Sequence, residues 1–148
     1  MSVAQTSVIA IVDDDQAIRE AIESLLKSAG YGVELFASAE EFLNSGPRQD
    51  ITCSVLDVRM PGMSGLELQN ELAASNRSIP IIFISAHSDE HARARALKAG
   101  AVDFLQKPFS EEALLNAINV SLAICRGRHA DDTEMQEPPS ELPGSPFS

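Results

Sequence analysis

Short apolar runs alternate along the chain with stretches of helical periodicity. The apolar runs span four to six residues without regular polar alternation, and they lie at 8–12, 31–36, 53–56, 81–84 and 101–105. Such runs are typical of parallel strands that are covered on both faces by helices, with each helix making a right-handed crossover. The order βαβαβαβαβα therefore predicts an α/β protein with a doubly wound, five-stranded parallel sheet.

Capping residues predict where the intervening helices begin and end. Asp15 is placed as the N-cap of the first helix, and Gly30 is placed to end it. Two serine–glutamate pairs have the capping-box spacing, in which each side chain accepts a hydrogen bond from the other residue's backbone N–H: Ser38 with Glu41, and Ser64 with Glu67. The fourth and fifth helices are expected at about 89–99 and from Ser110 to near Arg126.

The last part of the chain differs in composition from the rest. Residues 127–148 hold four of the eight prolines and few large apolar side chains, so they bury too little surface to offset the entropy of ordering. We expect one globular domain over 1–126 and a disordered, acidic, proline-rich tail over 127–148. Nothing after Arg126 has the length, basicity or apolar periodicity of a helix-turn-helix domain, so DNA binding by this chain is not expected.

Charge and cysteine usage narrow the classes of partner. The formal net charge is -11, whereas nucleic acids and anionic membranes bind clusters of Lys and Arg. The apolar run at 8–12 is too short for a signal peptide or a membrane span. Cys53 and Cys125 lie far apart and indicate neither a zinc pair nor a disulfide framework. The sequence predicts a cytoplasmic protein whose partners are proteins, phosphate or a cation.

Polar residues follow four of the five expected strands. They are Asp13, Asp14 and Asp15 after the first strand, Asp57 after the third, Ser85 after the fourth, and Lys107 with Pro108 after the fifth. In an open parallel sheet, ligands bind beyond the carboxyl ends of the strands. Crowded carboxylates repel one another unless a divalent cation neutralises them, and Mg²⁺ prefers oxygen ligands. At such a site a carboxylate can act as a nucleophile and form an aspartyl phosphate, while an ammonium stabilises the transferred group.

Four segments with these residues resemble a known family. IVDDD, LDVRMPGMSGLEL, FISAHSD and AGAVDFLQKPF are similar to the receiver domains of bacterial two-component response regulators, especially those of the FixJ-type branch. The resemblance covers roughly 7–125. It implies a (βα)5 flavodoxin-like fold and a switch that takes a phosphoryl group from a histidine kinase.

The resemblance also assigns roles around a Mg²⁺ ion. It makes Asp57 the phosphoacceptor and a metal ligand, Asp14 the second carboxylate ligand, and the backbone carbonyl of Arg59 the remaining protein ligand. Asp13 would act through water. Arg59 and His87 occupy family-variable positions that flank the site and are thought to tune the lifetime of the acyl phosphate.

A second set of residues would pass the signal on. The resemblance makes Lys107 the phosphate partner and Ser85 the switch hydroxyl, and it makes Phe104 the aromatic that moves inward as the hydroxyl turns to the phosphate. It also implies a cis peptide bond between Lys107 and Pro108. The surface that responds would be formed by the fourth helix, the fifth strand and the fifth helix. A downstream effector protein would bind there, and phosphorylation could drive homodimer formation through the face of helix four and strand five.

Other functions fit the same strand ends less well. A flavodoxin-like module would bind FMN there, but the loop after the first strand is acidic where a phosphate-bearing cofactor needs Ser, Thr and Gly donors. A phosphatase of the haloacid type needs an Asp two residues after its nucleophile, and that position is Arg59. We therefore expect self-limited phosphotransfer and autodephosphorylation rather than turnover of other substrates. The chain would be a single-domain regulator or, less favoured, the receiver fragment of a transcriptional regulator whose DNA-binding domain is missing.

Overall fold

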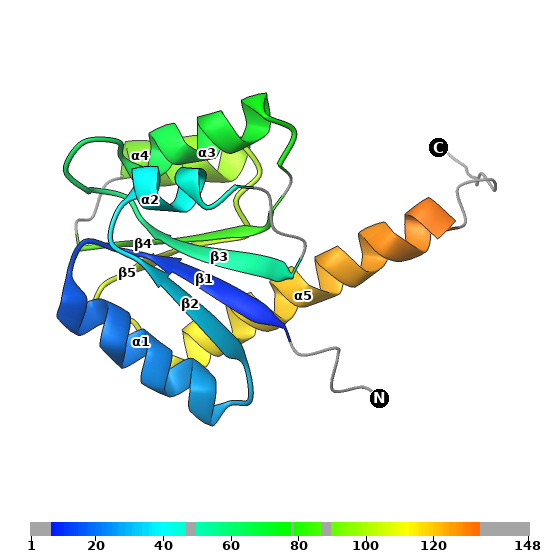
Figure 1. Cartoon of the computed structure of the whole chain (residues 1–148), viewed down its shortest axis with the longest axis horizontal. Coiled ribbons are helices and arrows are strands. Elements are labelled where there is room, and N and C mark those ends of the chain that lie inside the picture. Colours follow the sequence, from blue (N-terminus) through cyan, green and yellow to red (C-terminus); the bar gives the residue numbers. More distant parts are fainter. Residues whose placement is uncertain (1–6, 47–49, 78, 87–89, 134–148) are drawn as a thin grey trace.

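Five strands alternate with five helices in the computed structural model, which describes residues 7–46, 50–77, 79–86 and 90–133 (Figure 1). The strands are β1 (Val8–Val12), β2 (Gly32–Phe36), β3 (Ile51–Asp57), β4 (Ile81–Ser85) and β5 (Asp103–Gln106). The helices are α1 (Gln16–Ser28), α2 (Ala39–Asn44), α3 (Gly65–Ala74), α4 (Glu90–Lys98) and α5 (Glu111–Thr133). This order confirms the alternation read from the sequence.

The strands form one parallel sheet in the order β2-β1-β3-β4-β5. Helices α1 and α5 cover one face of the sheet, and α2, α3 and α4 cover the other (Figure 1). Alternate strand residues belong to opposite cores. Val12 and Phe83 lie in the core beneath α2, α3 and α4, whereas Ile11 and Ile84 lie in the core beneath α1 and α5. This is the doubly wound α/β architecture that the unbroken apolar runs predict, because each strand must present apolar side chains to both layers.

Helix caps follow the sequence signals with one exception. Asp15 accepts hydrogen bonds from the backbone N–H groups of Ala17 and Ile18, and Gly30 follows α1 with φ +96°. The capping box of Ser64 and Glu67 is complete. At α2, however, the predicted box is only half formed: the hydroxyl of Ser38 accepts from the backbone N–H of Glu41. The Glu41 carboxylate instead accepts from the N–H of Ala37, one residue before the cap.

Helix α5 extends further than the sequence analysis predicts. It was expected to end near Arg126, but its backbone stays helical to Thr133, so the expected helix end was wrong and 127–133, the first seven residues of the predicted tail, are helical. The segment 127–133 contains no proline, and its backbone N–H groups can continue the helical hydrogen bonding without tertiary packing. The remainder of the predicted tail, 134–148, lies outside the described residues, and its disorder stays a prediction. No described helix is long and apolar enough to span a membrane.

Candidate functional site

The aspartates that follow β1 and β3 meet at the carboxyl edge of the sheet. These strands are neighbours, with Val12 paired to Leu56. A carboxylate oxygen from each of Asp13, Asp14 and Asp57 therefore lies within 4.8 Å of the others. The side chains of Asp13 and Asp57 are buried, and that of Asp14 is exposed. The site thus brings together two buried acids and one acid open to solvent.

Lys107 reaches the same point from the loop after β5. Its ammonium nitrogen lies 3.2 Å from Oδ2 of Asp13 and 3.7 Å from Oδ2 of Asp57. The Lys107 backbone N–H donates to the carbonyl of Ser85 at 2.6 Å, which ties this loop to the end of β4. The peptide bond between Lys107 and Pro108 is cis, as the resemblance implies. One cation therefore bridges the two buried carboxylates.

The surroundings of Asp57 disfavour its ionised form. Burial, followed by the charge of Asp13, raises its pKa from 3.8 to about 6, although Lys107 and the backbone N–H of Arg59 act in the opposite direction. The Arg59 N–H lies 3.3 Å from Oδ1 of Asp57. Added positive charge at this point would lower the pKa of Asp57 again and favour the ionised, nucleophilic form of its carboxyl group. The three carboxylates supply the hard oxygen donors that Mg²⁺ prefers, so the donor set fits this ion.

Gly65 gives the Asp57 backbone the room it needs, and the sequence analysis missed this residue. Its N–H donates to the carbonyl of Val58 at 2.9 Å, which folds the β3–α3 loop back onto the strand end. A Cβ atom at position 65 would overlap the backbone carbonyl of Asp57 and approach the Phe83 ring. The sequence held a signal: a glycine directly after the N-cap Ser64 has no advantage for the helix itself.

Ser85 and Phe104, the two predicted switch residues, lie in the neighbouring strands β4 and β5. Ser85 is almost fully buried at the end of β4, one residue beyond the Ile84 that pairs with Asp57. Phe104 lies in β5 with 8% of its surface exposed, and its ring centroid is 6.2 Å from that of Phe83. Ser85 thus adjoins the acidic site. Phe104 belongs to the core between the sheet and α2, α3 and α4. His87, the second flanking position, is outside the described residues.

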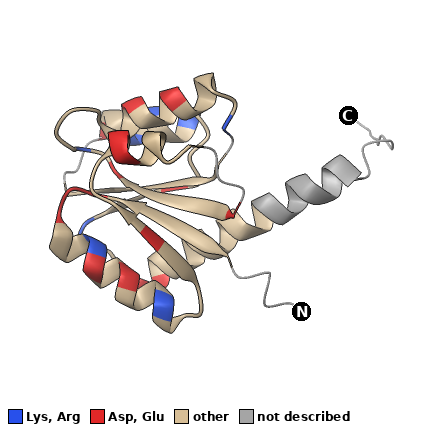
Figure 2. Cartoon of the chain, in the orientation of Figure 1, with Lys and Arg blue, Asp and Glu red and all other residues tan. Residues whose placement is uncertain are grey.

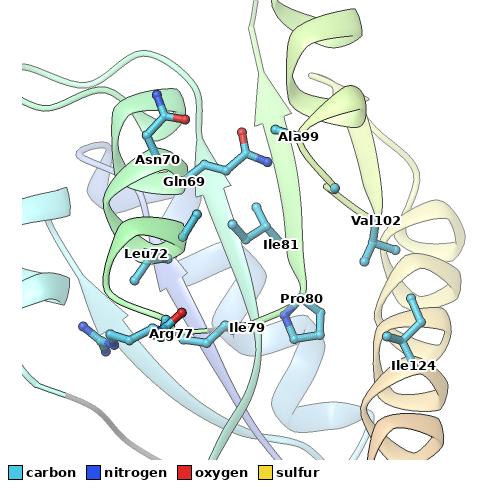
Figure 3. A pocket seen from close by; sticks show the side chains of 13 residues that line it. Gln69, Asn70, Leu72, Arg77, Ile79, Pro80, Ile81, Ala99, Val102 and Ile124 are labelled. Carbon is cyan, nitrogen blue, oxygen red and sulfur yellow. The ribbon is translucent and has the colours of Figure 1, made fainter.

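A second hollow lies at the opposite, amino edge of the sheet (Figure 3). It has a volume of about 370 Å³ and lies where β4 and β5 begin, between the ends of α3 and α4 and the side of α5. Its lining is mostly apolar, with Leu72, Ile81 and Ile124 beside the amide of Gln69 and the guanidinium of Arg77, and none of its lining residues is acidic. None of the strand-end residues predicted from the sequence lies there, so the acidic edge remains the candidate site.

Comparison with known proteins identifies the family. The family model of the response regulator receiver domain matches residues 9–119. The chain belongs to this family. In this receiver domain, the matched region includes every residue of the acidic site and omits 120–133, the last part of α5.

Individual relatives are longer than this chain. It is 48% identical over 133 residues to the response regulator protein TodT of Pseudomonas putida, covering 90% of this chain and 59% of that protein. It is 42% identical over 132 residues to the transcriptional regulatory protein FixJ of Azorhizobium caulinodans, covering 89% and 61%. The receiver domain thus spans about three fifths of the length of these curated relatives.

Solved structures show the same fold. The response regulator StyR is 48% identical, with a TM-score of 0.79 over 88% of this chain and 67% of that one. The FixJ-N structure is 37% identical, with a TM-score of 0.72 over 79% of this chain and 94% of that one. Since FixJ-N is covered almost completely, the likeness includes the whole (βα)5 unit. The FixJ-type resemblance read from the sequence is confirmed.

Proposed function

We propose that this receiver domain accepts a phosphoryl group on Asp57 from a histidine kinase in a reaction that requires Mg²⁺. The observation that carries the proposal is the meeting of three aspartates and Lys107 at one strand edge. Asp57 alone among them is the last residue of the central strand, β3, and both Lys107 and the buried Asp13 lie beside it. Membership of the receiver family supports the same chemistry.

Four groups would hold the ion. Asp14, Asp57 and the backbone carbonyl of Arg59 would be direct ligands, and Asp13 would act through water. The bound ion supplies the positive charge that keeps Asp57 ionised and neutralises the phosphoryl oxygens. Asp14 suits a direct role because its side chain is exposed, whereas Asp13 is already engaged by Lys107.

The remaining chemistry belongs to side chains of this domain. A carboxylate oxygen of Asp57 attacks phosphorus, a new O–P bond forms, and the bond to the donor's imidazole nitrogen breaks, so that the nitrogen leaves with its electron pair. The Lys107 ammonium stands 3.7 Å from Asp57, where it can bind an equatorial oxygen of the transferred group. The Ser85 hydroxyl then donates a hydrogen bond to the phosphoryl oxygen, and Phe104, which is already buried, adjusts its packing in response.

The output follows from the place of these two residues. Ser85 ends β4 and Phe104 is in the middle of β5, so a change at the site reaches the surface of α4, β5 and α5 through neighbouring strands. We propose that this surface binds an effector protein, and that phosphorylation favours a homodimer through α4 and β5. Light scattering with and without a phosphoryl mimic tests the dimer: a monomer in both states overturns it.

The phosphoacceptor role is tested by incubation with acetyl phosphate. The full chain should gain the mass of one phosphoryl group with Mg²⁺ present and none with EDTA. Asp57→Asn should abolish the gain, because the amide lacks the nucleophilic oxygen, while circular dichroism should show an intact fold. Retention of the full gain by Asp57→Asn would refute the assignment.

A further inference from the structure

Arg19 in α1 reaches back to the turn that carries two of the aspartates. Its Nη1 donates a hydrogen bond of 2.7 Å to the backbone carbonyl of Asp13, six residues earlier. The side chain is half-buried. In Figure 2 a basic segment at the start of α1 follows closely on the acidic turn after β1. This contact is unusual because a surface arginine beside several carboxylates is expected to pair with one of them.

The other charged groups of α1 have partners within the helix. Lys27 pairs with Glu23 at 3.0 Å, and the Glu20 carboxylate accepts from the side chain of Gln16. Within the described part of the chain, the recorded partner of the Arg19 side chain is the Asp13 carbonyl. A charged donor makes this a stronger bond than one between neutral groups. The guanidinium therefore acts on the backbone of the turn.

Asp13 is fixed by four separate contacts. Its N–H donates to the carbonyl of Phe36 at 3.1 Å, its Oδ1 accepts from the N–H of Asp15 at 2.9 Å, and its Oδ2 accepts from Lys107 at 3.2 Å. These three hold the strand end and the carboxylate. The fourth, from Arg19, holds the carbonyl, which belongs to the peptide group between Asp13 and Asp14.

The direction of that carbonyl decides where Asp14 stands. Because a peptide group is planar, fixing the Asp13 carbonyl also fixes the N–Cα bond of Asp14. The exposed side chain of Asp14 has no recorded hydrogen bond to other described residues. Its position therefore depends on the backbone, and the backbone depends on Arg19.

We propose that Arg19 is a positioning residue of the metal site, which orients the Asp13–Asp14 peptide so that the Asp14 carboxylate can bind the divalent cation. The inference rests on the proposed function. For the loss of Arg19, the inference and simple electrostatics predict opposite changes in the affinity for the divalent cation. Removing a nearby positive charge should by itself strengthen cation binding, whereas losing the positioning contact should weaken it.

The test uses the full chain with three substitutions. Arg19→Ala removes the contact and the charge, Arg19→Lys keeps the charge on a side chain without the guanidinium, and Lys27→Ala removes a cation from the far end of the same helix. Mg²⁺ affinity is measured from backbone amide NMR shifts at Asp14 and Arg59. The rate of phosphorylation by acetyl phosphate is measured across the Mg²⁺ titration.

Arg19→Ala should weaken Mg²⁺ binding about tenfold, in the range seen when a group that orients a metal ligand is lost. Arg19→Lys should be intermediate, and Lys27→Ala should match the wild type. At saturating Mg²⁺ the phosphorylation rate of Arg19→Ala should return to within about twofold of the wild type, because ligand positioning acts through cation binding. If Arg19→Ala does not fold by circular dichroism, the intermediate affinity of Arg19→Lys carries the same test.

Unchanged or tighter Mg²⁺ binding by Arg19→Ala, or a rate that stays low at saturating Mg²⁺, would overturn the inference while leaving the proposed function intact. Wild-type protein that neither binds Mg²⁺ nor gains a phosphoryl group would overturn the proposed function, and the inference with it. The wild-type measurement therefore separates the two failures.

Discussion

Polar side chains at the two edges of the sheet have different kinds of partner. At the amino edge, the side chain of Gln69 donates to the Ala96 carbonyl at 3.2 Å. Arg77 donates to the Gly46 carbonyl at 2.7 Å and lies over the Phe42 ring. Both of these side chains donate to a neutral backbone carbonyl, as buried polar groups in stable folds usually do.

At the carboxyl edge, charged groups face one another instead. Asp13 and Asp57 are both buried and share one ammonium, and burial raises the pKa of Asp57 to about 6. Such an arrangement is costly in a metal-free protein. The contrast teaches that the amino edge holds the fold together, whereas the carboxyl edge is kept in a state that a cation and a phosphoryl group can relieve. Substitutions at the two edges should therefore have different consequences.

The largest expected effect is on stability at the carboxyl edge. Gly65→Ala places a methyl group on the Asp57 carbonyl, and the backbone must shift to admit it. We expect the free energy of unfolding to fall by about 3 kcal/mol or more. Gly46→Ala is the control, because its φ of +76° strains an alanine but nothing lies within 4 Å; it should cost about 1 kcal/mol. Equal losses in urea denaturation would show that position 65 is not crowded.

The next effect is on the rate of phosphoryl transfer. Lys107→Ala should slow phosphorylation by acetyl phosphate about 100-fold, since it removes the cation that binds a transferred oxygen. Arg77→Ala is the control, because it removes a cationic side chain at the amino edge. It should lower stability and leave the phosphorylation rate unchanged. A comparable slowing in both variants would remove the functional distinction between the edges.

The smallest of the three effects is a stabilisation of the Asp57→Asn variant by about 2 kcal/mol, which should appear in the pH dependence of stability without divalent cations. The raised pKa means that the folded state favours the protonated form of Asp57. The contribution of Asp57 to the free energy of unfolding is therefore fully present below its unfolded pKa of 3.8 and is lost as the pH rises through about 6. That change corresponds to about 3 kcal/mol. Asp57→Asn removes the buried charge, but it also takes one of two carboxylate neighbours from Lys107. The variant should therefore recover only part of this free energy, about 2 kcal/mol.

The comparison is made by urea denaturation in EDTA at pH values on either side of 6. The stabilisation of Asp57→Asn over the wild type should be larger on the alkaline side. A difference that is independent of pH would show that Asp57 is already ionised freely in the metal-free protein.

Most of this site could be predicted from the sequence, because parallel strands place the residues that follow them at the same edge of the sheet. Once 8–12 and 53–56 are recognised as parallel strands, the residues that follow them must meet at one edge, and Asp13 and Asp57 need no further information. Lys107 also follows an expected strand, but a loop lysine is usually solvated, so its assignment depended on its register with Asp57. The placement of β5 next to β4 gives the structural reason for its position.

What the sequence could not supply depends on contacts between elements or on competition for a donor. Glu41 had two N–H groups within reach, and the spacing alone does not reveal that its carboxylate takes the one from Ala37. The overlap at Gly65 exists only once α3 packs against the end of β3. The contact from Arg19 to Asp13 needs the geometry of the turn. Helix α5 continues to Thr133, beyond the apolar periodicity from which its end was predicted.

The central claim is that Asp57 is the residue that carries the phosphoryl group. The most direct measurement is to phosphorylate the full chain with acetyl phosphate and Mg²⁺, reduce the acyl phosphate with borohydride, and locate the product by peptide mass spectrometry. An aspartyl phosphate is reduced to homoserine, so the account predicts homoserine at position 57 and unmodified aspartate at Asp13 and Asp14. Homoserine at position 13 or 14, or at none of the three, would contradict it.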